Sequence, residues 1–476
     1  MNKLLQKYNS ITVQAKAAFW FTMCSFLQKG ISFVTVPIFT RLMSTEQYGT
    51  YSMYLSWLQV FTVISTLYIY HGVTDNAMSK FDNDRDRYIS SMQGLTVCIT
   101  TVVMMLTFIF WHGIREFVGL SYIMMLLMFL EIYVTPALAF WSSKQRFEYK
   151  YRRLVIITLV KSILNPCLGI AAVCLSDEKD LARVISTVTV EFIVCGAIMA
   201  LQFIRGKVFY DKRYWGYSLR LAVPIVPHYL SGIILNQGDR IVISKIVGNS
   251  AVAFYGVAYS IGWIVQIFVR AINSAITPWI YERLKESDIR PIQRRSGSIL
   301  LLVFLMIIGL MLISPEVVLI FGSSKYADAV YVRPPVAGSV FFVFLYGFLS
   351  FPEFYYEKTG FLMMASIAAA VVNIVLNVIF IPLYGYVAAA YTTLACYVLY
   401  SLGHYIVGGK ILKDNTGFKA IIDVKITLVL SVAIIIISCA VHLFFDWIVL
   451  RYLIILIGAA AAFIKRKKIV ELIINK

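Results

Sequence analysis

The sequence predicts an all-α, polytopic membrane protein with about 14 transmembrane helices, arranged as two six-helix lobes followed by a C-terminal helix pair. Of the 476 residues, 60% are hydrophobic and 14% are charged, whereas soluble proteins carry about 25% charged residues. Apolar segments of about 20 residues, the length that crosses a hydrocarbon core of about 30 Å, follow one another along nearly the whole chain. The loops between them are short, so we expect no soluble domain.

Fourteen apolar segments define the expected spans, because each is long enough to cross the bilayer as a helix. In chain order they are 17–38, 47–71, 88–111, 117–141, 154–175, 183–204, 215–239, 251–280, 297–314, 334–354, 361–382, 386–407, 426–444 and 448–464.

The distribution of basic residues predicts the orientation of these spans. If both termini are cytoplasmic, 30 of the 43 Lys and Arg residues fall in inside segments, and 9 fall in outside turns or at the outer ends of spans, as the positive-inside rule requires. The net charge of +18 is therefore expected to set orientation and not to bind nucleic acid. Basic loops such as "ERLKESDIRPIQRR" (282–295) are expected to contact anionic lipid headgroups.

An internal repeat divides the chain. Residues 38–43, "IFTRLM", align without a gap on residues 242–247, "VISKIV", and the same offset of 204 places Tyr51 over Tyr255. Because both copies end an odd-numbered helix, they indicate two parallel halves, and transporters of this kind hold their substrate site between the halves. The expected domains are an N-terminal lobe at 1–210, a C-terminal lobe at 211–410, and a helix pair with a basic cytoplasmic tail at 411–476.

Arg183 and Arg451 stand at the outer ends of their spans and are counted with the outside turns. Four basic residues then remain inside the predicted spans: Lys29, Lys161, Arg220 and Arg270. Lys29 lies about 18 Å from the cytoplasmic start of its span, near the midplane. A charge there costs roughly 3 kcal/mol or more if it faces lipid, so we expect Lys29 to face a polar cavity or a partner. Arg270 and Arg220 could instead snorkel to the headgroups, and Lys161 could pair with an acid.

Three acidic residues also fall within or at the edge of spans. Counting residues along their spans places Glu131 and Glu191 near the middle of the membrane, and Asp239 lies at the outer end of the seventh span. They are candidates for ion or proton coupling, or for neutralising Lys161, and the residues alone do not choose between these roles. Pro224 and Pro227, close together in the seventh span, predict a bend there.

The chain lacks the motifs of common catalytic and metal sites. It has no GxxxxGK[ST] loop, no HExxH and no CxxC pair, and its seven cysteines lie in apolar segments. We therefore expect no cofactor, no metal site and no direct ATP hydrolysis.

Two turn motifs carry a family resemblance. "TRLMSTEQYGTYSMYLS" (40–56) and "GDRIVISKIVGNSAVAFYGVAYSIG" (238–262) resemble the corresponding turns of Wzx-type bacterial polysaccharide flippases. These belong to the multidrug/oligosaccharidyl-lipid/polysaccharide exporter (MOP) superfamily, together with the lipid II flippases and the MATE drug exporters. The motif residues are Arg41, Tyr48, Gly49, Tyr51, Asp239 and Arg240.

The resemblance implies a MATE-like transporter of the bacterial cytoplasmic (inner) membrane. It would move an undecaprenyl-diphosphate-linked oligosaccharide to the outer leaflet by alternating access, for O-antigen, capsule or exopolysaccharide synthesis. Helices 1, 2, 7 and 8 would line a cationic cavity containing Lys29, Arg270 and Arg220, with Lys161 as a further candidate. This chain departs from the pattern because its second span contains no Lys or Arg. The implied partners are the lipid-linked substrate and membrane lipids, with a polysaccharide polymerase and a chain-length regulator as candidate protein partners.

Two alternatives remain open. A MATE-type cation-coupled drug antiporter would need carboxylates in its cavity. The charged residues predicted near the membrane midplane are here mixed, with more weight on the basic Lys29 and Arg270. A polysaccharide polymerase or membrane glycosyltransferase would be expected to carry a large outer loop or an acidic catalytic pair, and the outer turns here are short.

Overall fold

The computed structural model describes residues 12–358 and 360–464, and all regular structure within these ranges is helical. The chain divides into two compact units, Met1–Ile233 and Ile234–Lys476, called here the N-terminal and C-terminal units. The predicted basic tail at 465–476 lies outside the described residues.

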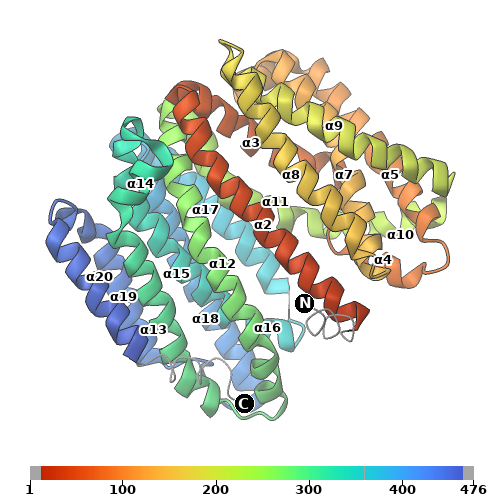
Figure 1. Ribbon diagram of the computed structural model, residues 1–476. Coiled ribbons are helices and arrows are strands. Elements are labelled where there is room, and N and C mark those ends of the chain that lie inside the picture. Colours follow the sequence, from red (N-terminus) through yellow and green to blue (C-terminus); the bar gives the residue numbers. More distant parts are fainter. Residues whose placement is uncertain (1–11, 359, 465–476) are drawn as a thin grey trace, which may run out of the picture. The chain divides into compact units, whose positions relative to one another are not determined.

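The N-terminal unit is built around one long helix, α9, which packs against α3, α5, α7 and α8, while α2 packs on α8 (Figure 1). Its helices are α2 (Val13–Leu42), α3 (Thr45–Thr66), α4 (Val73–Lys80), α5 (Arg85–Ile109), α6 (Trp111–Val118), α7 (Tyr122–Phe147), α8 (Tyr151–Cys174), α9 (Lys179–Gly206), α10 (Lys212–Ala222) and the 3₁₀ turn η1 (Val223–Ile225).

The C-terminal unit is centred on α15, which packs against α12, α13, α18 and α19 (Figure 1). The helix α11 (Val226–Ile246) leads from one unit into the other. The remaining elements are α12 (Asn249–Lys285), α13 (Arg290–Leu312), α14 (Ser314–Gly322), η2 (Ser324–Tyr331), α15 (Arg333–Leu349), α16 (Phe351–Tyr355), α17 (Gly360–Tyr384), α18 (Ala388–Thr416), α19 (Val424–Ala440), η3 (Val441–Phe444) and α20 (Ile448–Ile464).

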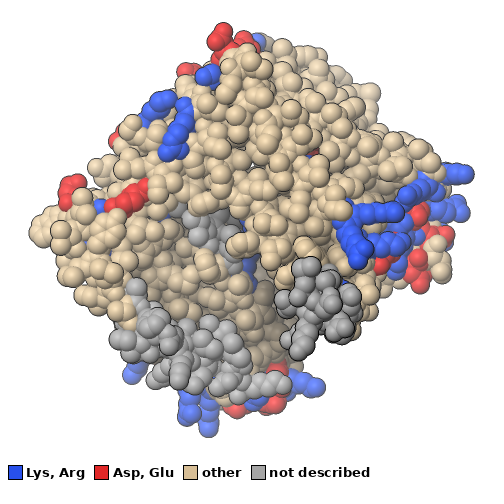
Figure 2. Space-filling model, in the orientation of Figure 1, with Lys and Arg blue, Asp and Glu red and all other residues tan. Residues whose placement is uncertain are grey.

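The predicted fold class is confirmed. Each of the fourteen apolar segments coincides with helical structure, and ten helices among the described residues are long and apolar enough to cross a membrane. The short helices α4, α6 and α14 have no predicted counterpart. The space-filling view shows broad areas without charged side chains on the face drawn (Figure 2), as expected of a multi-pass membrane protein.

The helix ends repeat with the offset found in the sequence. The helices α2 and α11 end at Leu42 and Ile246, and the helices that follow begin at Thr45 and Asn249, so each pair is separated by 204 residues. In the first turn Ser44 caps α3 through a reciprocal capping box with Gln47. In the second turn Gly248 has a φ of 111°, which glycine adopts at little cost. The two corresponding turns therefore use different local structures, a capping box in the first and a positive-φ glycine in the second.

The α-helix is interrupted at the place where Pro224 and Pro227 predict a bend. The helix α10 ends at Ala222, a 3₁₀ turn spans Val223–Ile225, and α11 begins at Val226. Proline has no backbone N–H and its ring clashes with the preceding turn, so a continuous α-helix is interrupted there.

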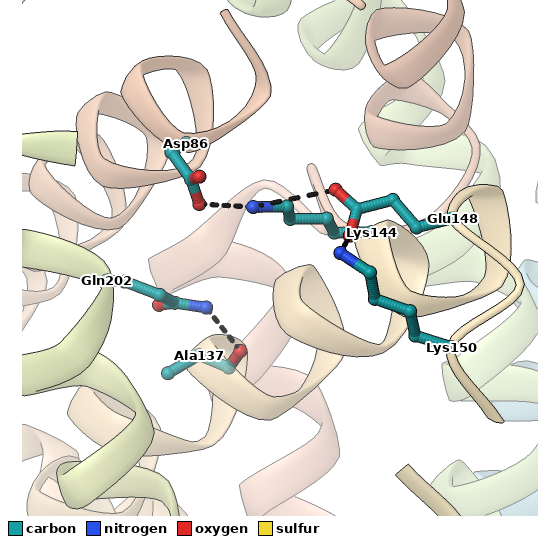
Figure 3. Close-up of polar contacts among 6 residues, drawn as sticks. All are labelled: Asp86, Ala137, Lys144, Glu148, Lys150 and Gln202. Carbon is teal, nitrogen blue, oxygen red and sulfur yellow. Dashed lines mark hydrogen bonds and ion pairs between the residues drawn. The ribbon is translucent and has the colours of Figure 1, made fainter. Parts of the chain in front are cut away.

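Ion pairs gather where α7 ends. Lys144 on α7 pairs with Asp86 on α5 and with Glu148, and the Lys150 ammonium lies 2.6 Å from Glu148 (Figure 3). Deeper in the same unit the Gln202 amide donates to the Ala137 carbonyl at 2.8 Å, which joins α9 to α7 (Figure 3).

Candidate substrate and ion-coupling residues

A lysine and a glutamate pair inside the N-terminal unit. The Nζ of Lys161 on α8 lies 2.7 Å from Oε2 of Glu191 on α9, and their side chains are 19% and 9% exposed. One helical turn later the Cys195 thiol donates to the same carboxylate at 3.2 Å. The positive charge of Lys161 is therefore compensated locally, and a role for Lys161 in substrate binding remains a prediction.

Glu131 lies in the same neighbourhood. Its carboxylate on α7 accepts a hydrogen bond from the Tyr54 hydroxyl on α3 at 2.8 Å, and the residue is 7% exposed. It also lies within electrostatic range of Glu191 and Lys161. The structure thus brings together three of the predicted site residues from three different helices.

Arg183 lies within electrostatic range of Glu131. It was not predicted as a site residue, because it begins the sixth predicted span and was counted with the outer turn. Its guanidinium donates to Thr187 at 2.9 Å and to the Asn165 side chain at 2.8 Å. It also lies 4.4 Å from the centre of the Phe39 ring and 5.4 Å from that of Tyr51, which favours a cation–π contact.

A sequence signal for this network was present. Arg183, Thr187, Glu191 and Cys195 recur every four residues along α9, and that spacing places them on one helix face. A polar stripe in an apolar span predicts a buried polar network, because such groups are costly when they face lipid.

Asp239 is the centre of a second network, in the C-terminal unit. It is fully buried on α11, accepts from the Asn377 amide at 2.6 Å and from the Thr393 hydroxyl at 2.7 Å, and also accepts from the Tyr255 hydroxyl. Asn373 donates to Thr393 and accepts from Asn377. The carboxylate is therefore held by side chains from α12, α17 and α18.

The asparagines in this network were also missed. Asn373 and Asn377 are four residues apart within an otherwise apolar segment, "VVNIVLNVI" (371–379). Two amides at that spacing share one helix face, so they could have been predicted to line a buried polar site.

The turn-motif residues have mainly packing contacts. Tyr48 is buried and Gly49 lies beside it at the start of α3, while the ring centres of Tyr48 and Tyr51 are 6.5 Å apart. Arg41 donates to the Pro37 carbonyl at 2.8 Å, within its own helix.

In the second turn motif, the Arg240 guanidinium lies 4.9 Å from the centre of the Tyr259 ring and donates to the Asn236 carbonyl at 3.2 Å. The ring contact joins the end of α11 to α12 within the C-terminal unit, while the hydrogen bond to Asn236 lies within α11.

The other three predicted cations are exposed. Lys29 lies on α2, Arg220 on α10 and Arg270 on α12. Within the described part of the chain no acidic side chain comes within ion-pair distance of Lys29. Lys29 therefore differs from Lys161, although both are lysines in apolar helices.

More than half of the chain matches the model of a known protein family. Residues 15–284 match the family model described as "Polysaccharide biosynthesis protein". The chain belongs to this family. A relative from Haemophilus influenzae, "Lsg locus putative protein 1", is 21% identical over 361 residues, which cover 73% of this chain and 86% of the relative.

Solved structures show the same fold for this family member. "Lipid II flippase MurJ, inward closed conformation" matches with a TM-score of 0.71 and 15% identity, covering 94% of this chain and 99% of that structure. An "inward-facing conformation of a multidrug resistance MATE family transporter of the MOP superfamily" matches with a TM-score of 0.59 and 12% identity, covering 82% and 96%. The resemblance drawn from the two turn motifs is thus confirmed for the family and the fold.

Proposed function

We propose that this protein is a flippase that moves an undecaprenyl-diphosphate-linked oligosaccharide from the cytoplasmic to the outer leaflet for surface polysaccharide synthesis. Membership of the polysaccharide biosynthesis family supports the substrate class. The fold shared with a lipid II flippase supports transport of a lipid-linked sugar.

The single observation that carries the proposal is Lys29. It lies in the middle of the 30-residue helix α2, its side chain is exposed, and it has no acidic partner among the described residues. An ammonium facing lipid at this depth would cost about 3 kcal/mol or more. A water-filled path that receives a diphosphate removes this cost, because the anion supplies the missing charge.

Arg270 and Arg220 are proposed to assist Lys29. Both side chains are exposed, Arg220 on α10 and Arg270 on α12, and a diphosphate accepts several charge-assisted hydrogen bonds from Arg and Lys donors. Moving each negative charge outward is favoured by about 2.3 kcal/mol per 100 mV when the cytoplasm is negative. We propose alternating access as the route, with the break between α10 and α11 as a hinge.

We propose Asp239 as an ion- or proton-coupling residue. Its carboxylate is surrounded by hydroxyl and amide groups, a donor set that suits a monovalent cation, or a proton on the carboxylate itself. This feature also favours the second candidate function, a MATE-type cation-coupled drug antiporter. The two candidates predict opposite charges for the transported substrate.

The experiment is complementation of surface polysaccharide in a strain that lacks this chain. Lys29→Ala and Lys29→Gln should reduce polysaccharide roughly tenfold or more, because a charged hydrogen bond contributes about 1.5–3 kcal/mol, while Lys29→Arg should retain most of it. Ser25→Ala, one turn away on the same exposed stretch of α2, is the matched control. If the Lys29→Ala and Arg270→Ala variants are expressed and support a normal amount of surface polysaccharide, the proposal that these cations bind the diphosphate is refuted.

A further inference from the structure

Two segments far apart in the sequence build a basic pocket at one end of the C-terminal unit. The first two turns of α13 contribute Arg290 and Arg294, and the loop before α19 contributes Lys419 and Asp423. The pocket has a volume of about 490 Å³ and is open to the surroundings.

Hydrogen bonds fix the two walls of the pocket to each other. The Gln293 amide donates to the Ala420 carbonyl at 2.8 Å, and the Asp423 backbone N–H donates to the Ser296 hydroxyl at 2.8 Å. Ala420 and Ser296 are buried. The pocket is therefore part of the packed unit and does not depend on loose side chains.

The pocket has an uncompensated positive charge. Arg290, Arg294 and Lys419 are exposed, and none of them forms an ion pair with another described residue. The single acid in the lining, Asp423, caps α19 by accepting from the Ile426 N–H at 3.1 Å. Both α13 and α19 begin at the pocket, so the partial positive charge of two helix N-termini adds to that of the three side chains.

An apolar surface lies beside the pocket. The helix α19 belongs to a candidate membrane span, Val424–Phe444, and its side chains Ile426, Leu428 and Val429 are 44%, 63% and 66% exposed. A ligand that fits both surfaces has a phosphate at one end and a hydrocarbon chain at the other.

We propose that this pocket binds an anionic glycerophospholipid. Arg290, Arg294 and Lys419 hold the phosphate, and the acyl chains lie along the exposed face of α19. Basic pockets between membrane helices bind such headgroups through charge and hydrogen bonding. This site is independent of the proposed transport function and of the cations assigned to it.

Native mass spectrometry of the full chain in detergent tests the proposal, with phosphatidylglycerol and the zwitterionic phosphatidylethanolamine as probes. The variant Arg290→Gln/Arg294→Gln/Lys419→Gln should lose phosphatidylglycerol affinity by about tenfold or more, since each basic residue near an anionic headgroup contributes on the order of 1 kcal/mol. The matched control, Lys358→Gln/Lys410→Gln/Lys413→Gln, removes the same charge from exposed residues of the same unit outside the pocket. It should change the affinity by less than about twofold.

A second variant moves the affinity in the opposite direction, which misfolding cannot imitate. Asp423→Asn removes the acid from the lining while keeping a residue that caps helices equally well, so phosphatidylglycerol should bind about fivefold more tightly. The proposal would be overturned if the triple variant in the pocket and the control triple variant lost the same phosphatidylglycerol affinity, or if Asp423→Asn left that affinity unchanged. Competition by millimolar inorganic phosphate, which would indicate a free-phosphate site, would also overturn it, as would binding of undecaprenyl phosphate but not phosphatidylglycerol, which would indicate a substrate site.

Discussion

Two lysines in apolar helices of the N-terminal unit have opposite surroundings. Lys161 pairs with Glu191 at 2.7 Å and is largely buried, whereas Lys29 is exposed and has no acidic partner within the described ranges. Hydropathy treats the two residues alike. Their partners distinguish a lysine that is paired within the unit from one whose charge no described acid balances.

The Lys161–Glu191 pair can be tested by a double-mutant cycle. Lys161→Met or Glu191→Gln alone leaves one charge unpaired in a largely buried site, so each should destabilise the protein by about 3 kcal/mol. The double variant should recover at least about 1 kcal/mol relative to the sum, since contacting residues couple. Thermal unfolding of the purified protein in detergent measures both effects. Strictly additive losses would mean that the two side chains do not interact.

At the scale of elements, the polar networks depend on close approach between helices. A Cβ atom at Gly169 on α8 would lie 2.5 Å from Nη1 of Arg183 on α9 and 3.0 Å from the Phe39 ring on α2. This glycine therefore allows Arg183 to reach its partners on three helices.

Gly169→Ala should destabilise the N-terminal unit by about 1–3 kcal/mol, because the added methyl group overpacks the Arg183 site. Gly30→Ala is the matched control: it is also within a helix, but no atom lies within 4 Å of the added Cβ. It should be neutral, or stabilising by up to about 1 kcal/mol. The melting temperatures of the two variants in detergent give the comparison, and equal shifts would contradict the packing argument.

The helix α20 is held to α14 by a salt bridge with a predictable pH dependence. The Arg451 guanidinium donates to both oxygens of Glu316 at 2.8 and 2.9 Å. Burial alone would raise the pKa of the Glu316 carboxyl, but the hydrogen bond from Arg451 and a backbone N–H outweigh burial and lower it below 4.5. The stabilisation is thus fully present above pH 4.5 and is lost as the pH falls through the lowered pKa.

The difference in melting temperature between the wild type and Glu316→Gln should accordingly be constant from pH 7 to about pH 5 and should narrow below about pH 4.5. Asp446→Asn, which removes an acid from the turn before α20, controls for general carboxylate titration. A gap that stays constant down to pH 3 would show that the ionised carboxylate of Glu316 does not stabilise the fold.

At the scale of the whole molecule, the sequence predicted the helices better than the site. Long apolar segments identified every major helix, because a membrane span must satisfy its own backbone hydrogen bonds. The turn repeat was located to the residue, since Leu42 and Ile246 end their helices with the expected offset. The pairing of Lys161 with Glu191 could be raised only as one alternative, because hydropathy does not specify which helix faces meet.

The remaining site residues were missed for the same reason. Arg183 lies near a helix start and was counted as a turn residue, although its side chain is directed into the unit, where it contacts Asn165. Asn373 and Asn377 are uncharged, and a search for ionisable groups overlooks them. Side-chain spacing along each helix contains this information, but partners on other helices become known only from the folded chain.

The most direct measurement of the central claim is the flipping of a lipid-linked oligosaccharide by purified protein in vesicles. The lipid carries a short labelled sugar, and a membrane-impermeant quencher reports the fraction exposed on the outer leaflet. Wild-type protein should move the inner-leaflet pool outward, and Lys29→Ala should slow this roughly tenfold or more, while Lys29→Arg stays close to wild type. Transfer no faster than in protein-free vesicles, or unchanged rates in Lys29→Ala, would contradict the account.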